Sequence, residues 1–248
     1  MKVGIFIADS NGCYPVPASR GGAISGLVEN LIKENNKKQR MDMEIISYYD
    51  KRAEILSKQY PNISFQWVKV PKLINTIDKG LFFLVKNILK KGKAVSFKSL
   101  FSLGYYILCG SIYMKIGNYN KVILENNIPM AWMIKLSGFK GEYYYHFHNV
   151  PRIDAGCRTV FSGCKNIFCI SEFVAKQICG ENSAIGKIEY NKIKIYHNCI
   201  DEMCFNEQLS SVITEQYRKK LGISKKDKVV LFVGRMSAEK GIDQLLNA

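Results

Sequence analysis

Two histidines near the middle of the chain are the residues best suited to acid–base chemistry. His146 lies within the segment Glu142 to Phe147, which has the composition of a β-strand, and His148 follows it. Because side chains alternate along a strand, both rings are expected on one face. Histidine changes its charge near neutral pH, so the pair is a candidate for catalysis or for binding a polar ligand. The alternative is two core histidines whose ring nitrogens bond to backbone carbonyls.

A carboxylate and two amides follow another short apolar segment. Lys121 to Glu125 is expected to form a strand, and Asn126 and Asn127 come directly after it. Glu125 and Asn126 are candidates for hydrogen bonds to hydroxyl groups of a bound ligand. A surface position for Glu125 is the alternative. The third histidine, His197, is expected to line the same edge of the sheet as a polar residue.

Glycines and cations mark two further loops. Gly21 and Gly22 follow the first apolar segment, where the lack of Cβ would let a ligand approach the backbone closely. Arg235 and Lys240 flank a loop that begins at Gly234, and two cations beside a helix N-terminus suit a diphosphate. The alternatives are a plain tight turn at the first loop and an ordinary solvated loop at the second.

Apolar periodicity supplies the elements that would position these residues. Strands alternate with helical segments, which is typical of a doubly wound parallel sheet whose ligands bind at the carboxyl ends of the strands. We expect a first domain over residues 1–205, a linker over 206–227 and the beginning of a second domain over 228–248, so that the chain is a fragment. The expected strands are 3–8, 44–49, 64–70, 121–125, 142–147, 166–170, 192–196 and 228–234.

A lysine-rich segment separates the third strand from the fourth. One face of the expected helix is apolar and another is basic, a pattern typical of binding to an anionic membrane surface. A helix packed on the sheet with solvated lysines is the alternative. The next segment, Ser99 to Met114, is uncharged but too short to span a bilayer, and is expected to be a core helix. The lysines of the basic face are Lys72, Lys79, Lys86, Lys90 and Lys93.

Composition excludes several classes of protein. The chain has 248 residues, 47% of them hydrophobic, which excludes a disordered or fibrous protein. A net charge of +15 favours anionic partners. The eight cysteines form no CxxC pair, so we expect buried reduced thiols and no metal site. The N-terminal apolar run is too short for a signal peptide, and a cytoplasmic protein is expected.

In this order along the chain, several short motifs resemble those of the GT-B glycosyltransferases, specifically the retaining enzymes of family 4. The motifs are Arg20-Gly21-Gly22, the histidine at a strand end, Ile170-Ser171-Glu172, Asn198-Cys199-Ile200-Asp201, and Val230-Leu231-Phe232-Val233-Gly234-Arg235 with Glu239-Lys240-Gly241. The resemblance implies a GT-B type α/β fold with two Rossmann-like domains, the first for the acceptor and the second for the nucleotide sugar.

The resemblance also implies roles for individual residues. His148 would contact the transferred sugar, with His146 packing against it or orienting it. Arg235, Lys240 and Gly234 would bind the donor diphosphate, and Gly21 and Gly22 would lie against phosphate or acceptor. No metal or other cofactor is expected. The departing phosphate would take the acceptor proton, so the resemblance implies no dedicated pair of carboxylates.

Other implications concern the whole enzyme. It would take a UDP-, GDP- or dTDP-sugar and a glycan or lipid-linked acceptor in bacterial surface polysaccharide synthesis, at the inner face of the cell membrane. The family's Glu-x7-Glu motif is absent from the chain, and Ile24 and Ser25 stand where many members have an acid. This fragment alone is expected to be inactive.

Two other classes of protein are possible on composition. A basic nucleic-acid-binding module would explain tyrosines among lysines, but no RRM, KH or helix-turn-helix pattern occurs, and no nucleic-acid partner is expected. Another nucleotide-dependent α/β enzyme is disfavoured by the missing GxGxxG fingerprint.

Overall fold

The computed structural model describes residues 1–8, 14–88, 98–200, 211–234 and 240–247. The chain divides into two compact units, Met1–Ile200 and Asp201–Ala248.

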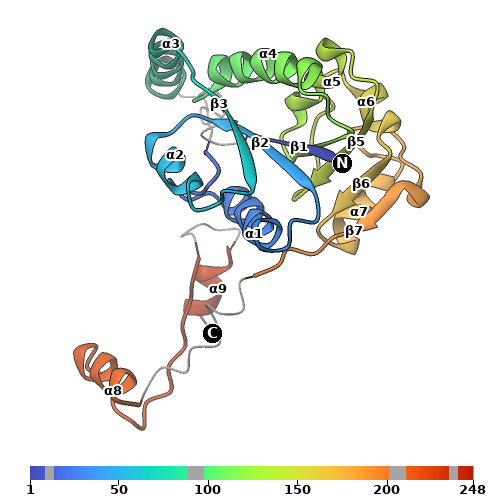
Figure 1. Ribbon diagram of the computed structural model, residues 1–248. Coiled ribbons are helices and arrows are strands. Elements are labelled where there is room, and N and C mark those ends of the chain that lie inside the picture. The colour runs from blue at the N-terminus through green and yellow to red at the C-terminus, as the bar shows by residue number, and fades with distance from the viewer. Residues whose placement is uncertain (9–13, 89–97, 201–210, 235–239, 248) are drawn as a thin grey trace. The chain divides into compact units, whose positions relative to one another are not determined.

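A seven-stranded parallel sheet forms the centre of the first unit (Figure 1). Every neighbouring pair of strands is parallel, and the order is β3-β2-β1-β4-β5-β6-β7. The order reverses between β1 and β4, and open α/β sheets bind ligands at such a reversal, beyond the carboxyl ends of the strands. The strands are β1 (Lys2–Ile7), β2 (Asp42–Tyr48), β3 (Ile63–Val68), β4 (Lys121–Glu125), β5 (Glu142–Phe147), β6 (Asn166–Cys169) and β7 (Ile193–Ile195).

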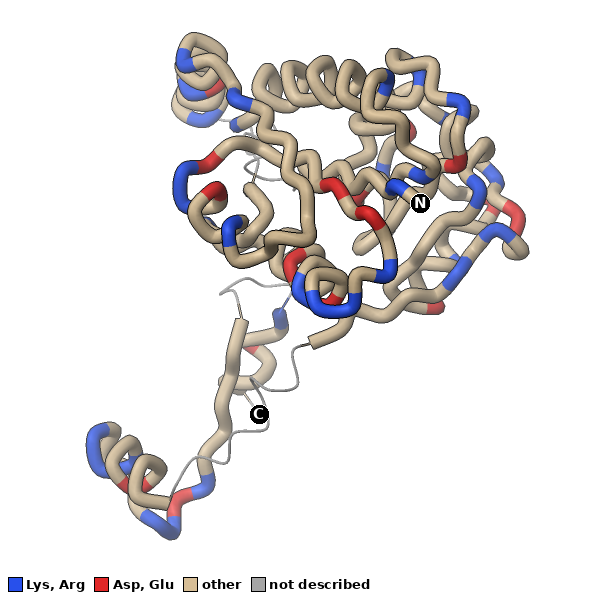
Figure 2. Tube along the Cα trace, in the orientation of Figure 1, with Lys and Arg blue, Asp and Glu red and all other residues tan. Residues whose placement is uncertain are grey.

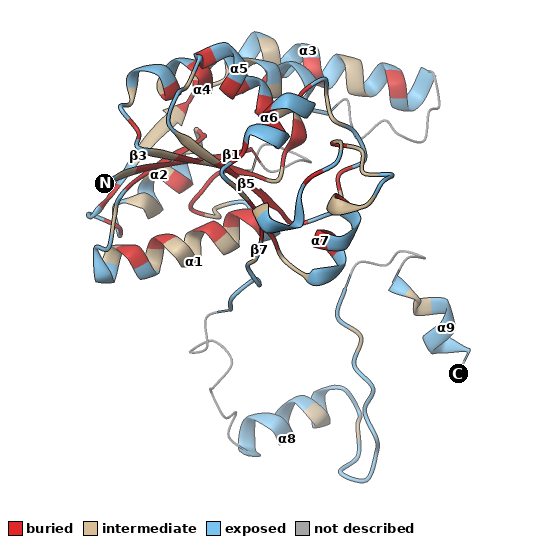
Figure 3. Cartoon of the chain, turned by 90° about the vertical axis from the view of Figure 1, so that its right-hand side faces the viewer, coloured by how far each residue is buried: buried red, intermediate tan, exposed pale blue. Residues whose placement is uncertain are grey.

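Helices cover the two faces of this sheet unequally. One face packs against α4 (Leu100–Ile116), α5 (Trp132–Ser137), α6 (Arg158–Gly163) and α7 (Glu172–Cys179), which share a core with residues from all seven strands. The opposite face packs against α1 (Ala23–Lys38), whose Ile24, Val28 and Ile32 meet β1, β2 and β3 in a smaller core. Figure 3 shows α1 and α4 on opposite sides of the sheet. The remaining helical segments of this unit are α2 (Lys51–Ser57), α3 (Lys72–Phe83), its π-helical continuation η1 (Leu84–Ile88), and the short 3-10 helices η3 (Ile128–Ala131) and η4 (Tyr190–Lys192).

The helix α4 packs in the core along one side only. Its inner side is buried: the Tyr106 hydroxyl donates to the carbonyl of Ile46 at 2.6 Å and accepts from the amide of Ile7 at 3.1 Å. Its outer side is not, because Leu108, Ile112 and Ile116 are all more than half exposed. The uncharged segment thus packs in the core along its inner side, as expected of a core helix, while its outer side is exposed. No helix of the described residues is both long and apolar enough to cross a membrane.

The cysteines follow the prediction only in part. Among the described residues, six are free thiols, and Cys157, Cys164 and Cys169 are buried as expected. Cys199 is exposed. Cys13 and Cys204 lie outside the described residues.

The second unit contains α8 (Ser211–Lys220) and α9 (Ile242–Leu246). The predicted strand over residues 228–234 was wrong: this segment has no strand pairing, and Val230, Leu231 and Val233 are 77–84% exposed. A strand needs a neighbour for its backbone hydrogen bonds, and the described part of this unit holds no second strand.

Candidate functional site

Three ionisable side chains meet at the carboxyl ends of β4 and β5. We call Glu125, His146 and His148 the Glu-His cluster. The parallel register places Glu125 beside His146, and alternation brings His148 to the same face. The Glu125 carboxylate lies 3.1 Å from His146 Nδ1 and 3.0 Å from His148 Nε2. The two imidazole ring centroids are 4.1 Å apart.

Glu125 is buried and charged. Only 2% of the residue is exposed, so the alternative of a surface position is wrong. Burial by itself raises the pKa of this carboxyl, but hydrogen bonds from His146 and His148 outweigh it and lower the pKa to about 2. The carboxylate is therefore ionised at neutral pH and can only accept hydrogen bonds.

An ionised Glu125 determines which histidine nitrogens carry hydrogen. His146 Nδ1 and His148 Nε2 face the carboxylate and must donate to it. His146 Nε2 and His148 Nδ1 are buried and have no partner among the described residues. The alternative that the ring nitrogens bond to backbone carbonyls is therefore wrong for this pair. One nitrogen of each ring is left to bind a ligand.

Asn126 holds the histidine backbone in place. Its side-chain oxygen accepts from the amide of His148 at 2.9 Å, and its own amide donates to the carbonyl of His146 at 2.8 Å. The residue has a φ of 54°, in the left-handed region that asparagine tolerates better than most residues. The described geometry thus gives Asn126 a positioning role, since its side-chain oxygen is already used.

Hydrophobic residues of α1 and one tyrosine enclose the cluster. Leu27, Val28 and Leu31 line a cavity of about 10 Å³ beside His146 and His148, which is room for about one water. A larger cavity of about 380 Å³ reaches Glu125 and His146 from the side of the sheet that α1 covers. Tyr196 lines both cavities, and its ring centroid lies 5.7 Å from that of His146.

Sequence reasoning did not find Tyr196. The available signal was its place just after the last strand of the sheet, at the same edge as the cluster. His197, which was expected there as a polar residue, is exposed and its Nδ1 lies 2.9 Å from the carbonyl of Ile170.

The glycine pair begins α1. Gly21 and Gly22 have φ values of 78° and 100°, and Gly22 is the residue that precedes the first turn of the helix. Positive φ explains the need for glycine at both positions. Arg20, beside them, donates to the Asp50 carboxylate at 2.7 and 2.8 Å. Neither glycine is among the described residues that line the cavities beside the cluster.

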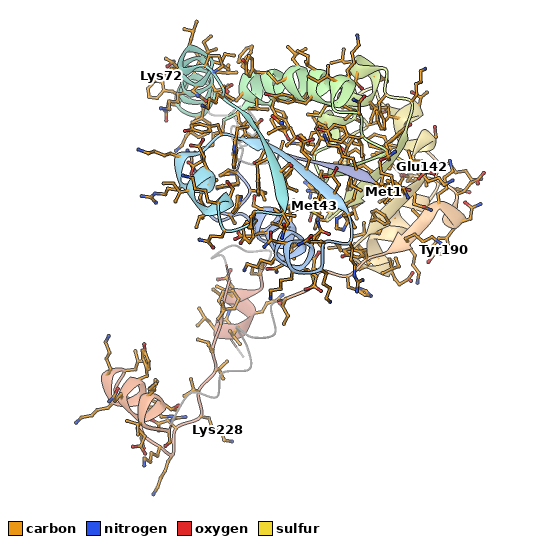
Figure 4. The ribbon with its side chains drawn as sticks, viewed as in Figure 1. Met1, Met43, Lys72, Glu142, Tyr190 and Lys228 are labelled. Carbon is orange, nitrogen blue, oxygen red and sulfur yellow. The ribbon has the colours of Figure 1, made fainter. Side chains whose placement is uncertain are left out.

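The predicted donor-binding and membrane residues lie elsewhere. Gly234 and Lys240 are exposed residues of the second unit, and Arg235 lies outside the described residues. Lys72 and Lys79 are exposed on α3, and Lys86 on η1, whereas Lys90 and Lys93 lie outside the described residues. Figure 2 shows Lys and Arg along α3 with acidic residues rare there, and Figure 4 marks Lys72 at its beginning.

The Glu-His cluster is also the set of ligand atoms best placed for a metal. Within the described part of the chain, it is the group of three His, Cys, Asp or Glu side chains whose ligand atoms lie within 4.8 Å of one another. Two histidines and a carboxylate suit several divalent cations. The nitrogens that face the carboxylate would have to lose their protons to bind one. The expectation of no metal stays a prediction.

Comparison with known proteins agrees with the fold and the motifs. No protein-family model matches the chain. A segment of 90 residues, 36% of the chain, is 27% identical to an uncharacterized glycosyltransferase, MJ1607 of Methanocaldococcus jannaschii, and covers 22% of that protein. The structure of Anabaena Alr3699/HepE in complex with UDP and glucose superposes with a TM-score of 0.51 and 13% identity. This alignment covers 90% of the chain and 50% of HepE.

The chain thus spans about half the length of the structure that it resembles and matches a smaller part of its curated relative. Its seven-stranded parallel sheet, its fold similarity to HepE and its sequence similarity to a glycosyltransferase agree with the resemblance that the motifs predicted. The chain has a fold similar to that of HepE and, over part of its length, a sequence similar to that of a glycosyltransferase.

Proposed function

We propose that this chain is the acceptor-binding part of a retaining glycosyltransferase that uses a nucleotide sugar. The observation that carries the proposal is the Glu-His cluster, which lies at the carboxyl ends of β4 and β5, beside the reversal of strand order between β1 and β4. The fold similarity to a protein that binds UDP and glucose and the sequence similarity to a glycosyltransferase support it.

In this proposal, the Glu-His cluster contacts the sugar that is transferred. His148 is nearer the carboxyl end of the strand and presents Nδ1 to a sugar hydroxyl, while Glu125 holds its other nitrogen. The unprotonated Nδ1 of His148 accepts a hydrogen bond from the hydroxyl. The Glu125 carboxylate stabilises positive charge that develops on the sugar or on the imidazole ring. His146 packs against His148 and orients it.

The chemistry requires no second carboxylate. In a retaining transfer without a covalent intermediate, the phosphate that leaves the anomeric carbon acts as the base. It takes the proton of the acceptor hydroxyl as the new glycosidic bond forms on the same face of the sugar. Arg235 and Lys240, with the glycine turn at Gly234, neutralise the charge that grows on the departing nucleotide.

The acceptor is proposed to be lipid-linked, and the first unit to bind the inner face of a bacterial membrane during surface polysaccharide synthesis. Support comes from α4, whose outer side is exposed. The whole helix has 17 residues and one charged side chain, that of Lys115. Leu108, Ile112 and Ile116 are spaced four residues apart on that side and are 57–64% exposed. The helix α3, which carries exposed lysines, contacts α4, and lysines together with an apolar stripe favour binding to an anionic lipid surface.

Nucleotide release from a panel of donors tests the proposal. The full-length protein is incubated with UDP-, GDP- and dTDP-sugars, with and without a membrane lipid extract, and free nucleotide is measured. Release from one donor class, stimulated by lipid extract, is expected to fall at least about 10²-fold in Arg235→Ala and Lys240→Ala, with Lys226→Ala as the control. NMR of the product should show the anomeric configuration of the donor.

Absence of release and of donor binding across the panel would overturn the proposal. An inverted product would overturn the retaining mechanism alone.

A further inference from the structure

A third cavity, which the Glu-His cluster does not line, has a strongly basic lining. Its volume is about 690 Å³, and it lies between α3, the beginning of α4 and the carboxyl ends of β2 and β3. We call it the basic cavity. Five of its lining side chains are cationic and one is acidic: Arg20, Lys69, Lys72, Lys79 and Lys98 against Asp78.

The acidic residue does not neutralise the lysines. Asp78 is 2% exposed, and its two oxygens accept from the amides of Phe101 and Ser102 at 2.8 and 2.9 Å. The Ser102 hydroxyl donates to it as well. Its charge thus compensates the N-terminus of α4, where free amides favour an anion. Asp78 serves as the cap that attaches α4 to α3.

The lysines of the basic cavity have no carboxylate partner among the described residues. Lys69, Lys72, Lys79 and Lys98 form no ion pair there, although Lys69 Nζ lies 4.3 Å above the ring of Tyr49. Arg20 is different, because Asp50 already holds its guanidinium. Four unpaired ammonium groups around one cavity repel one another, and a bound anion would relieve that repulsion.

The position of the basic cavity relates it to the proposed reaction. Tyr48 ends β2, Lys69 follows β3, and Glu125 ends β4, so parallel strands bring the cavity and the cluster to the same edge of the sheet. Adjacent strands lie about 4.8 Å apart, so β2 and β4 are separated by about 10 Å and β3 and β5 by about 20 Å. A ligand that occupies both places has its anionic group about 10 to 20 Å from the reacting hydroxyl.

The geometry points to the basic cavity as the binding site for a phosphate or diphosphate ester group of the acceptor. This inference rests on the proposed function for its link to sugar transfer, but the binding itself does not. Lysine ammonium groups, with the hydroxyl of Ser99, suit phosphate oxygens. Leu100 and Phe101, at the beginning of α4, are nearly half exposed next to the cavity, where the apolar part of a lipid ester could lie.

Binding of pyrophosphate to the full-length protein tests the site without any sugar transfer. Isothermal titration calorimetry at moderate salt measures the Kd of wild type, of Lys72→Gln/Lys79→Gln and of the control Lys115→Gln/Lys140→Gln. The control removes the same charge from exposed lysines that do not line the cavity. We expect the cavity variant to bind at least tenfold more weakly and the control within twofold of wild type. Equal weakening in both variants, or no binding by wild type, would overturn the inference.

A second arm distinguishes a lipid ester from a soluble one. Phosphatidylcholine vesicles that contain a polyprenyl diphosphate are compared with vesicles that contain phosphatidylglycerol at equal charge. Stronger sedimentation with the first, lost on adding pyrophosphate and in Lys72→Gln/Lys79→Gln, assigns the site to a lipid-linked diphosphate. Equal sedimentation, together with tight pyrophosphate binding, assigns it to a soluble phosphate ester. Pyrophosphate binding by a protein that transfers no sugar would refute the proposed function and leave the anion site standing.

Discussion

At the scale of residues, the Glu125 carboxylate determines the state of the site. It accepts from both histidines, its pKa is lowered to about 2, and it directs one unpartnered nitrogen of each ring away from itself. A buried charge that loses its partners costs several kcal/mol, so the three side chains stabilise one another as a unit.

Replacement of this carboxylate should reduce stability in a pH-dependent way. Glu125→Gln is expected to lower the free energy of unfolding at pH 7 by about 1 to 3 kcal/mol. The glutamine amide has the same shape, but it is neutral and has a single acceptor oxygen, whereas the carboxylate is charged and accepts hydrogen bonds from both rings. The folded pKa of about 2 lies below the ordinary value of 4.5. The carboxylate therefore contributes fully above pH 4.5, and its contribution disappears as the pH falls towards 2. Urea unfolding at several pH values measures the difference.

The exposed Glu181 provides the control, and Glu181→Gln should change the free energy of unfolding by less than about 0.5 kcal/mol at every pH. A Glu125→Gln variant with a constant stability difference from pH 7 to pH 2 would contradict this account of the cluster.

The thiols give a second prediction for single residues. Burial raises the pKa of Cys164 and of Cys169 to about 12, with smaller effects from neighbouring charges. The thiolate is the reactive form, so both should resist alkylation by iodoacetamide at pH 8 in the folded protein. Exposed Cys199 should react before either of them. Peptide mass spectrometry before and after unfolding measures this order, and rapid labelling of Cys164 in the folded protein would exclude its buried position.

At the scale of elements, the beginning of α1 depends on backbone conformation. Gly22 has a φ of 100° and a ψ of 121°, which an L side chain rarely adopts. We expect Gly22→Ala to reduce the free energy of unfolding by about 1 to 3 kcal/mol. Gly26, one turn into the same helix, has no neighbouring atom within 4 Å of the place a Cβ would take, and Gly26→Ala should leave stability unchanged or raise it by up to about 1 kcal/mol. Thermal unfolding compares the two, and equal losses would contradict the cap assignment.

Most elements of the first unit could be predicted from the sequence. Continuous apolar runs bounded by polar residues identified all seven strands of the sheet to within a few residues, because buried parallel strands have that composition. Ser171 caps α7 through its hydroxyl, which accepts from the amide of Val174 at 3.3 Å, and serine is a common residue at this position of a helix. Two short helices, α2 and α6, lack the repeated periodicity on which helix prediction depends, although Asp50 caps α2.

Predictions from the sequence failed where the structure depends on tertiary contacts, because a local sequence pattern does not specify which other segment a residue contacts. An uncharged helix pattern does not say that one side of α4 stays exposed, and an apolar run over 228–234 does not supply a second strand. For the site, strand-end position found Glu125, His146 and His148. It did not give their mutual hydrogen bonds, because these depend on the order and register of β4 and β5.

At the scale of the whole molecule, membrane binding should depend on both apolar and basic surface. We expect the protein to sediment with anionic vesicles at low salt and to be released as salt rises, since the Debye length falls. Ile112→Gln should weaken binding roughly tenfold by removing apolar burial of about 1 to 2 kcal/mol. Ile153 lies outside α4 and is 57% exposed, against 59% for Ile112. The control variant Ile153→Gln should therefore bind like wild type. Equal binding by Ile112→Gln and wild type would exclude α4 as the contact surface.

The most direct test of the account is the effect of His148 on sugar transfer by the full-length protein. With the donor identified by nucleotide release, the rate of product formation at saturating donor is measured for wild type, His148→Ala and the exposed control Lys187→Ala. The Glu-His cluster as the sugar-contacting site predicts a loss of at least about 10²-fold for His148→Ala and a change of no more than about twofold for the control. A folded His148→Ala variant that transfers sugar at the wild-type rate would contradict it.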